Sequence, residues 1–387
     1  MRAEKVLFML RPFRPFLLLI FMTTLAAAST TDSTRLVYFG TYTKKESKGL
    51  YAARFDTATG TFTPATLVAP AGNPTFIALH PRLPILYALH DLKNDQGGND
   101  GAVTAYMIDP ATGALTVLNS RPAGGPPLCY IHADPAGRAL LISSYHGGYV
   151  ASYPLLADGS IGERASFIKH TGKGPQPAQD APHAHCFDFV PGTSFAFSAD
   201  LGADKIVPYR VDPATAALTP NGTPYAAHPG SGPRHLAFHP NKRFAYAINE
   251  LTATVTAFTL DASTGSLGEI ETVDAIPGDF IGRRWGAEIA IHPNGQFLYA
   301  SLRADHESIA LFSIDEKSGR LTFIAHTHEG IKHPRHFIID PTGRWLLCAN
   351  HDTNNVNVFA IDQSTGLLTP NGHTLPVLSP VCILFAH

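Results

Sequence analysis

Apolar and polar residues alternate in short runs along this chain, and the runs come in pairs. In PRHLAFHPNKRFAYAINE (residues 233–250), two alternating runs flank a His-Pro turn. A period of two residues bounded by Gly, Pro or Asn turns is typical of antiparallel strands joined by tight turns. The pattern occurs six times at intervals of 48 to 56 residues, marked by Pro81, Pro135, Pro191, Pro240, Pro293 and Pro341.

A second turn follows each pair of runs and leads into further alternating runs. It has the form D-x-x-T-G, as in DPATG (109–113) and DQSTG (362–366), with ADGS (157–160) taking its place once. The Asp side chain bonds the turn backbone, and the Gly supplies a positive φ. Seven such turns but only six proline units are present, and each unit has room for four strands.

The seventh unit is divided between the two ends of the sequence. Residues 35–43 and 49–56 resemble the later strands of a unit, whereas residues 379–386 resemble a first strand. Pairing these segments closes a ring of four-stranded units. We therefore predict an all-β fold, a seven-bladed β-propeller formed as one domain by residues 31–387. The alternative, an open β-solenoid, does not account for the complementary ends.

The first 30 residues have the order of a secretory signal. A basic segment precedes FLLLIFMTTLAAAS, which combines an apolar core with small residues suited to cleavage. The apolar part is short for a membrane span. We predict a signal peptide over residues 1–30, an exported protein that is periplasmic or secreted, and no stable membrane partner; an uncleaved anchor is the alternative.

Composition narrows the function classes. Charged residues make up 16% of the chain and the net charge is −2, which leaves no basic field for a nucleic-acid partner. We read the cysteines as buried apolar residues, because each lies in a separate unit without a zinc-binding spacing: Cys129, Cys186, Cys348 and Cys382. The oligomeric state is not set by the sequence.

Aligning the six units places most candidate chemistry at one mouth of the central channel. The position six residues before the marker proline holds Thr75, Cys129, His185, Arg234, Ala287 and Arg335. The position five before it holds Phe76, Tyr130, Cys186, His235, Glu288 and His336. Ten residues after it stand Asp91, Tyr145, Leu201, Glu250, Arg303 and His351. The entry of the first strand and the exit of the second lie at the same end of a blade, so these side chains converge.

This mouth suits water attack on an anionic substrate, or proton removal from one. Arginine binds carboxylate or phosphate and stabilises developing negative charge, and His or Glu transfers the proton. No G-x-S-x-G nucleophile motif is present. The alternatives are an ion-pair network between blades for Arg234, Arg335 and Glu250, and a metal site at His183 and His185. We expect no metal or other cofactor, because the His pair lacks a third ligand of evident spacing.

Three histidines that precede turn prolines lie at the opposite end of the first strand. We predict that they bond the turn backbone, as Asp134 and Asp340 do in the same place, and that they take no part in chemistry: His80, His239 and His292.

Several motifs together resemble the propeller-type 6-phosphogluconolactonases, which are related to the fungal carboxymuconate-lactonising enzyme. They are YFGTYT, APHAHC with ADLGADKI, GPRHLAFHP with AINEL, AEIAIHPNGQFLYASLR and PRHFIIDPTGRWLLCAN. The resemblance covers the chain after residue 35. It implies a seven-bladed propeller without an obligatory metal that acts on lactones of sugar acids, with catalytic residues His185, Arg234, Glu250 and Arg303.

Combining the mouth with this resemblance, we predict hydrolysis of a sugar-acid lactone, with Glu250 or His185 as the base. Further substrate contacts are predicted for His183, His235, Glu288, Arg335 and His336. Ala178 stands where these enzymes often carry an arginine, and this change, like the export signal, favours a lactone without a phosphate. The alternatives are a muconate-type lactonising cycloisomerase and a non-enzymatic propeller that binds a partner.

Overall fold

The computed structural model describes residues 1, 4, 9 and 33–386, and the propeller begins at Thr34. Apart from Met1, Glu4 and Met9, the predicted signal peptide lies outside the described residues. Strands dominate residues 33–386, and the only helical element described there is one short 3-10 turn, η1 (Pro177–Gln179). Within the described part of the chain, no helix has the length and apolar character needed to cross a bilayer.

The strands form seven antiparallel sheets, which we call blades 1 to 7. Blade 1 contains β5 (Ile77–Leu79), β6 (Ile85–Lys93), β7 (Asn99–Ile108) and β8 (Leu115–Pro122). Blade 2 contains β9 (Tyr130–Ala133), β10 (Ala139–Ser144), β11 (Tyr149–Pro154) and β12 (Ser166–Lys169). Blade 3 contains β13 (Ala184–Phe189), β14 (Phe195–Asp200) and β15 (Lys205–Val211), with β16 (Leu218–Pro220) and β17 (Tyr225–Ala226) sharing its outer edge.

The remaining four blades follow in the same order around the ring. Blade 4 contains β18 (Pro233–Phe238), β19 (Phe244–Asn249), β20 (Thr254–Asp261) and β21 (Ser266–Asp274). Blade 5 contains β22 (Arg284–Ile291), β23 (Phe297–Ala304), β24 (Ser308–Ile314) and β25 (Leu321–Thr327). Blade 6 contains β26 (Pro334–Ile339), β27 (Trp345–Asn350), β28 (Asn355–Ile361) and β29 (Leu368–Pro376). Blade 7 contains β30 (Pro380–Phe385), β1 (Thr34–Thr41), β2 (Gly49–Asp56), β3 (Thr61–Phe62) and β4 (Thr66–Pro70).

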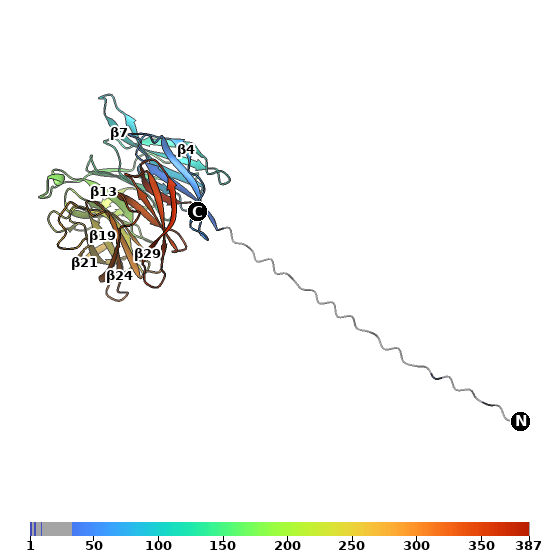
Figure 1. Cartoon of the computed structure of the whole chain (residues 1–387). Coiled ribbons are helices and arrows are strands. Elements are labelled where there is room, and N and C mark those ends of the chain that lie inside the picture. Colours follow the sequence, from blue (N-terminus) through green and yellow to red (C-terminus); the bar gives the residue numbers. More distant parts are fainter. Residues whose placement is uncertain (2–3, 5–8, 10–32, 387) are drawn as a thin grey trace. The chain divides into compact units, whose positions relative to one another are not determined.

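The blades close into a ring, as the sequence predicts. Each first strand contacts the first strand of the next blade, and the cycle is completed where β30 meets β5. Blade 7 is built from both ends of the propeller sequence, because β30 pairs with β1 through Tyr38 and Leu384. Figure 1 shows the red β30 region beside the blue strands that begin the propeller. The seven-bladed propeller is confirmed, and the open solenoid is excluded.

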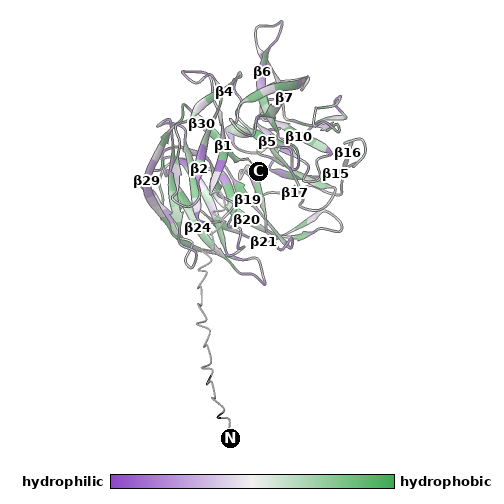
Figure 2. Ribbon diagram, turned by 90° about the vertical axis from the view of Figure 1, so that its right-hand side faces the viewer, coloured by the Kyte–Doolittle hydropathy of each residue, from purple (hydrophilic) through white to green (hydrophobic). Residues whose placement is uncertain are grey.

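The core is a set of apolar layers between adjacent blades. Between blades 4 and 5, for example, Tyr246, Ile248 and Val255 pack with Leu298 and Phe312. Figure 2 shows apolar residues in green along strands such as β19 and β24, and hydrophilic residues in purple along the outer strand β29. Removing these faces from water stabilises the stacked blades by roughly 25 cal/mol for each Å² of apolar surface buried.

The Asp turns also hold neighbouring blades together. The buried hydroxyl of Tyr246 in blade 4 donates to the carbonyl of Gly319, in the Asp turn of blade 5, at 2.9 Å. Tyr38, Tyr87 and Tyr299 make the same bond to the turn glycine of the next blade. The D-x-x-T-G turn therefore supplies an acceptor to its neighbour as well as closing its own blade.

Replacing Tyr246 with phenylalanine is expected to destabilise the propeller by about 1–3 kcal/mol, because the buried Gly319 carbonyl loses its donor. Urea unfolding of the two proteins measures the difference. Tyr51→Phe is the matched control, since the Tyr51 hydroxyl only accepts an exposed bond from the Lys48 amide. Equal losses in both variants would contradict a role for the bond between blades.

The turn histidines behave as predicted. Nδ1 of His239 accepts from the Asn241 amide, and Nε2 donates to the carbonyl of Gly295 in the next blade at 2.8 Å. His292 repeats both bonds, and His80 accepts from its own turn. Their place at this end of the first strands separates them from the polar mouth.

Candidate active site

Five of the seven inner strands carry a register shift at the entry to the channel: β13, β18, β22, β26 and β30. In β13, β18 and β26 the residue two positions into the strand has no partner on the second strand, and the register shifts by one there. A bulge changes the direction of the extra side chain and lets two consecutive residues leave the normal alternation. The residues skipped by the pairing are His185, Arg234 and Arg335.

A cavity of about 500 Å³ opens at this mouth. Four predicted site residues line it: His185, Glu250, Arg303 and Arg335. The others on its wall are Tyr42, Lys44, Asn73, Thr75, Asp91, Asn99, Pro127, Leu128, Cys129, Tyr145 and His146. A volume of this size accommodates a monosaccharide derivative and its water.

Glu250 links two arginines in the wall of this cavity. Its Oε2 lies 2.9 Å from Nε of Arg234 and 2.8 Å from Nη2 of Arg303. Arg234 belongs to the same blade as Glu250, and Arg303 to the next. Arg234 also donates from Nη1 to the carbonyl of Ala287 in blade 5, so its side chain joins the two blades. Arg234 itself does not line the cavity. An ion-pair network between blades therefore exists here, and two of its members face the cavity.

The charges of the network favour negative charge that develops in the cavity, as on an oxyanion. Burial by itself would raise the pKa of Glu250, but Arg303, Arg234 and Arg335 outweigh it and hold that pKa below its usual value. Burial and the neighbouring Arg303 lower the pKa of Arg234 to about 10, which still leaves it charged at neutral pH. Three guanidinium groups against one carboxylate leave a surplus of positive charge beside the cavity.

His185 is neutral and has a free ring nitrogen. Burial, followed by the charge of Arg234, lowers its pKa well below the usual value. Its Nδ1 is buried without a hydrogen-bond partner among the described residues. The backbone around it is fixed, because its carbonyl accepts from the hydroxyl of Ser143 at 2.9 Å. A neutral imidazole held in the cavity wall can accept a proton.

Three further predicted residues form a buried layer that does not line the cavity. His235 donates from Nδ1 to Glu288 at 3.0 Å, and Nε2 of His336 lies 3.4 Å from the same carboxylate. The rings of Phe76 and Tyr130 pack against these histidines. In the aligned repeat, these three residues stand five positions before the marker proline, one residue after the position that holds His185, Arg234 and Arg335. They enclose one another. Their contact with substrate stays a prediction.

This buried layer makes the fold sensitive to acid. Burial lowers the pKa of His336 to about 4, and it lowers that of His235 well below its usual value. Between pH 6.5 and 4 the unfolded chain binds protons that the folded chain excludes, so stability falls as pH falls. For His336 alone the loss is on the order of 3 kcal/mol. The raised pKa of Glu288 acts in the opposite direction and offsets part of it.

Unfolding in urea at pH 7 and at pH 4.5 is expected to show this loss of stability. In His336→Gln the loss between the two pH values is expected to be smaller, because one group that must be neutral in the fold has been removed. His373→Gln, at an exposed position, is the control and should leave the pH dependence unchanged. A wild-type stability that does not change over this range would contradict the assignment.

His183 supports the cavity without lining it. Its ring stacks on Tyr145 at 4.2 Å, and Nδ1 donates to the carbonyl of the same residue at 2.8 Å. Nε2 lies 3.3 Å from Asp180. Both nitrogens of His183 therefore have protein partners, which argues against the His183–His185 metal site. Its direct contact with substrate stays a prediction.

Cys129 differs from the expectation for the cysteines. Cys186, Cys348 and Cys382 are buried as predicted, whereas Cys129 is half-buried and lines the cavity. Burial of its thiol raises the pKa to about 11, so it is protonated at neutral pH and is a poor nucleophile.

Several cavity residues were missed although the repeat contains a signal for some of them. Thr75 and Cys129 occupy the same aligned position as His185, and Asp91 and Tyr145 share the position of Glu250. Residues such as Tyr42, Lys44 and Asn99 have no such signal. The first two follow β1 in an irregular segment, so no repeat equivalence points to them.

Comparison with known proteins agrees with this architecture. Residues 36–385 match the family model described as "Lactonase, 7-bladed beta-propeller". The 6-phosphogluconolactonase of Bacillus subtilis (strain 168) is 37% identical over 350 residues, which cover 90% of this chain and 98% of that protein. The solved structure of the periplasmic gluconolactonase of Pseudomonas aeruginosa matches with a TM-score of 0.83 and 31% identity, covering 92% of this chain and 99% of that one.

A crystal structure from Bacteroides fragilis gives a similar result, with a TM-score of 0.85, 36% identity and coverage of 93% of this chain and 99% of that one. Fold, strand order and sequence thus agree over nearly the whole propeller. This chain belongs to the lactonase family of seven-bladed β-propellers.

Proposed function

We propose that the protein hydrolyses a sugar-acid lactone in the cavity at the mouth of the channel. The observation that carries the proposal is the pairing of a neutral His185 with the Arg234–Glu250–Arg303 network around one cavity. Water attacks the lactone carbonyl carbon, the ring C–O bond breaks, and the products are a carboxylate and a hydroxyl group. The surplus positive charge stabilises both the oxyanion and the carboxylate that replaces it.

The geometry favours His185 over Glu250 as the general base. Oε2 of Glu250 is engaged by both Arg234 and Arg303, so it is not free to accept a proton from water. His185 is neutral and has an unpaired nitrogen. We assign His185 the proton from the attacking water. Glu250 holds Arg303 in place, and Arg303 with Arg335 faces the carbonyl oxygen of the substrate.

We further propose that the preferred lactone carries no phosphate. Asp91 lines the cavity with its carboxylate held by Asn73 at 2.8 Å and by Asn99 at 3.2 Å. A carboxylate in this place accepts hydrogen bonds from sugar hydroxyls and repels a phosphate dianion. Ala178 stands where the related enzymes often carry an arginine, so it supplies no positive charge for a phosphate. The name of the Pseudomonas relative, gluconolactonase, is consistent with such a substrate.

Asp91→Asn is expected to narrow the preference for gluconolactone over 6-phosphogluconolactone by roughly tenfold in kcat/KM, since removing one like charge relieves about 1.4 kcal/mol of repulsion. Lys44→Gln, which removes a cation from the same wall, should shift the ratio in the opposite direction. An unchanged ratio in Asp91→Asn would contradict the proposed role of the carboxylate.

The proposed activity is tested with purified protein and fresh aldonolactones, because these compounds also hydrolyse spontaneously. Proton release in weak buffer should be faster than in protein-free solution for at least one lactone. No acceleration over buffer with gluconolactone, galactonolactone and 6-phosphogluconolactone would overturn the proposal. Formation of a lactone from a carboxymuconate would instead support a cycloisomerase.

We also propose that the protein is exported through residues 1–30. The support is the basic, apolar and small-residue order of that segment. The mass of the protein recovered from a bacterial periplasm tests it, since cleavage after the small residues removes about 30 residues. Recovery of full-length protein only in the cytoplasm would contradict export.

A further inference from the structure

Three histidines gather on blade 5, outside the cavity and unused by the proposed reaction. His306 lies in the turn between β23 and β24, His326 lies near the end of β25, and His328 follows that strand. The ring centroids are 4.8 Å apart for His306 and His326, 5.0 Å for His306 and His328, and 5.9 Å for His326 and His328. One ligand nitrogen from each ring lies within 4.8 Å of those of the other two.

Hydrogen bonds orient each ring and leave one nitrogen free. Nδ1 of His306 pairs with the hydroxyl of Ser308 at 2.9 Å. Nε2 of His326 donates to the carbonyl of Ala275 at 2.8 Å, and Nδ1 of His328 donates to that of Glu307 at 3.1 Å. The remaining nitrogen of each ring has no hydrogen-bond partner among the described residues. Fixing one imidazole nitrogen with a protein oxygen is how metal-binding histidines are usually oriented.

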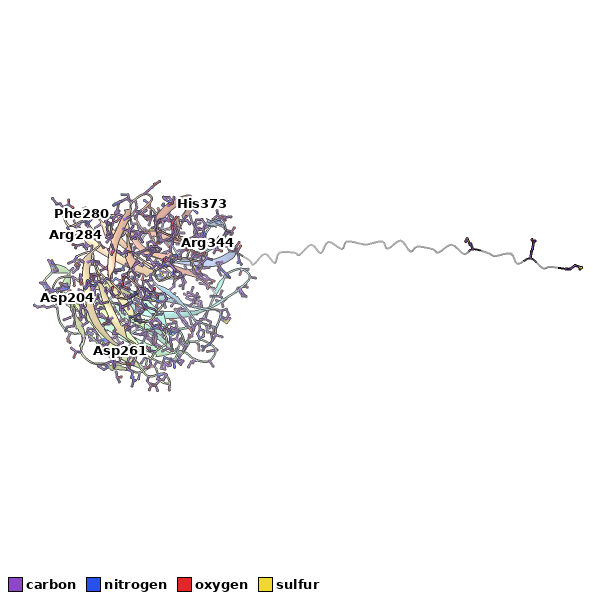
Figure 3. The ribbon with its side chains drawn as sticks, turned by 90° about the horizontal axis from the view of Figure 1, so that it is seen from below. Asp204, Asp261, Phe280, Arg284, Arg344 and His373 are labelled. Carbon is purple, nitrogen blue, oxygen red and sulfur yellow. The ribbon has the colours of Figure 1, made fainter. Side chains whose placement is uncertain are left out.

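His306 is the buried member of the three. Phe280 packs edge-to-face on His306 at 5.0 Å and covers its buried side. Arg284 holds this cover through a bond to the Phe280 carbonyl. Figure 3 labels Phe280 and Arg284 close together at one edge of the molecule.

We propose that His306, His326 and His328 form a binding site for one divalent transition-metal ion that prefers imidazole ligands, such as Zn²⁺. Tetrahedral bonds of about 2.0–2.1 Å place donor nitrogens roughly 3.4 Å apart. The three nitrogens lie within 4.8 Å of one another, so they must approach by at most roughly 1.4 Å. His328 is exposed and can make this movement, whereas His306 is buried and fixed. The three ligand atoms are imidazole nitrogens and none is a carboxylate oxygen, which suits Zn²⁺ or Cu²⁺ better than Mg²⁺ or Ca²⁺.

A surface hollow of about 440 Å³ adjoins the cluster and gives an ion and its water access from solvent. His306 and His328 both line it. The hollow leaves room for a water molecule as the fourth ligand. The neighbouring Glu307 accepts from the His333 amide at 3.0 Å, two residues before Arg335, so a bound ion would also restrain the segment that leads to the cavity.

Titration of Zn²⁺ into chelator-treated, tag-free protein tests the site by calorimetry, with Tm as a second readout. We expect one ion per chain and a rise in Tm. His306→Gln and His328→Asn should each reduce affinity by more than roughly tenfold. His373→Asn is the matched control, because His373 is exposed and lies away from Phe280 in Figure 3.

Because His306 is buried, its substitution can weaken the fold. The Zn²⁺ affinity of the exposed variant His328→Asn is therefore the deciding measurement. Circular dichroism establishes that each variant is folded before titration. Unchanged Zn²⁺ affinity in folded His328→Asn, or no binding by the unaltered protein, would overturn the proposal. The result is independent of lactone hydrolysis, since none of the three histidines lines the catalytic cavity.

Discussion

Changing Glu250 to glutamine is expected to lower kcat/KM for an aldonolactone by roughly 10²–10³-fold. The neutral amide no longer holds Arg303 and Arg234 in place, and the donors that face the oxyanion lose their orientation. The folded state should also lose about 3 kcal/mol, because breaking a buried ion pair leaves its partners uncompensated. Initial rates above the spontaneous reaction, together with urea unfolding, measure the two effects.

Glu269→Gln provides the matched control for this substitution. Glu269 lies on the outer strand of the same blade and bonds Tyr225 and His228 away from the cavity. Its replacement should leave kcat/KM within about twofold of the original value. Full activity in Glu250→Gln would show that the network only supports the fold.

Changing His185 to glutamine is expected to lower kcat by roughly 10²–10⁴-fold with a smaller change in KM, because the base is lost while the arginines that bind the substrate remain. A base must be unprotonated to act, so protonation of His185 produces an acidic limb in the profile of kcat/KM against pH. The lowered pKa places this limb below pH 6.5. The limb should disappear in His185→Gln.

His146→Gln separates proton transfer from general disturbance of the cavity. His146 lines the same wall, so its loss is expected to change KM but to preserve the acidic limb. If His185→Gln kept both kcat and the limb, the base would have to be another group, and Glu250 would be the next candidate.

The fold could be predicted from the sequence because the same pattern of strands and turns recurs in each blade. Alternation and turn residues recur in every blade, so an ambiguous segment is read against its equivalents. The ends of the chain were paired correctly because 379–386 supplies the strand that 35–56 lacks. Propensity alone would not have joined segments so distant in sequence.

The site was only partly predictable, and the bulges explain where the alignment was too coarse. A regular strand sends neighbouring residues to opposite faces, yet Arg-His stands at both 234–235 and 335–336, near the axis. A bulge turns the arginine toward the mouth and leaves the histidine in the layer below. The alignment placed both in one polar mouth, whereas packing separates them. Two consecutive polar residues in an otherwise alternating strand were the available signal.

The pairing of β30 with β1 has a consequence for how the propeller is made. Their partners are roughly 350 residues apart, so at 5–20 residues per second β1 waits about 20–70 s after synthesis for its inner neighbour. During that interval its unpaired edge can accept the equivalent strand from another molecule. In refolding, the same unpaired edge can take up β30 from its own chain or from another, so high protein concentration should yield domain-swapped dimers in which the β30 of each chain completes blade 7 of the other.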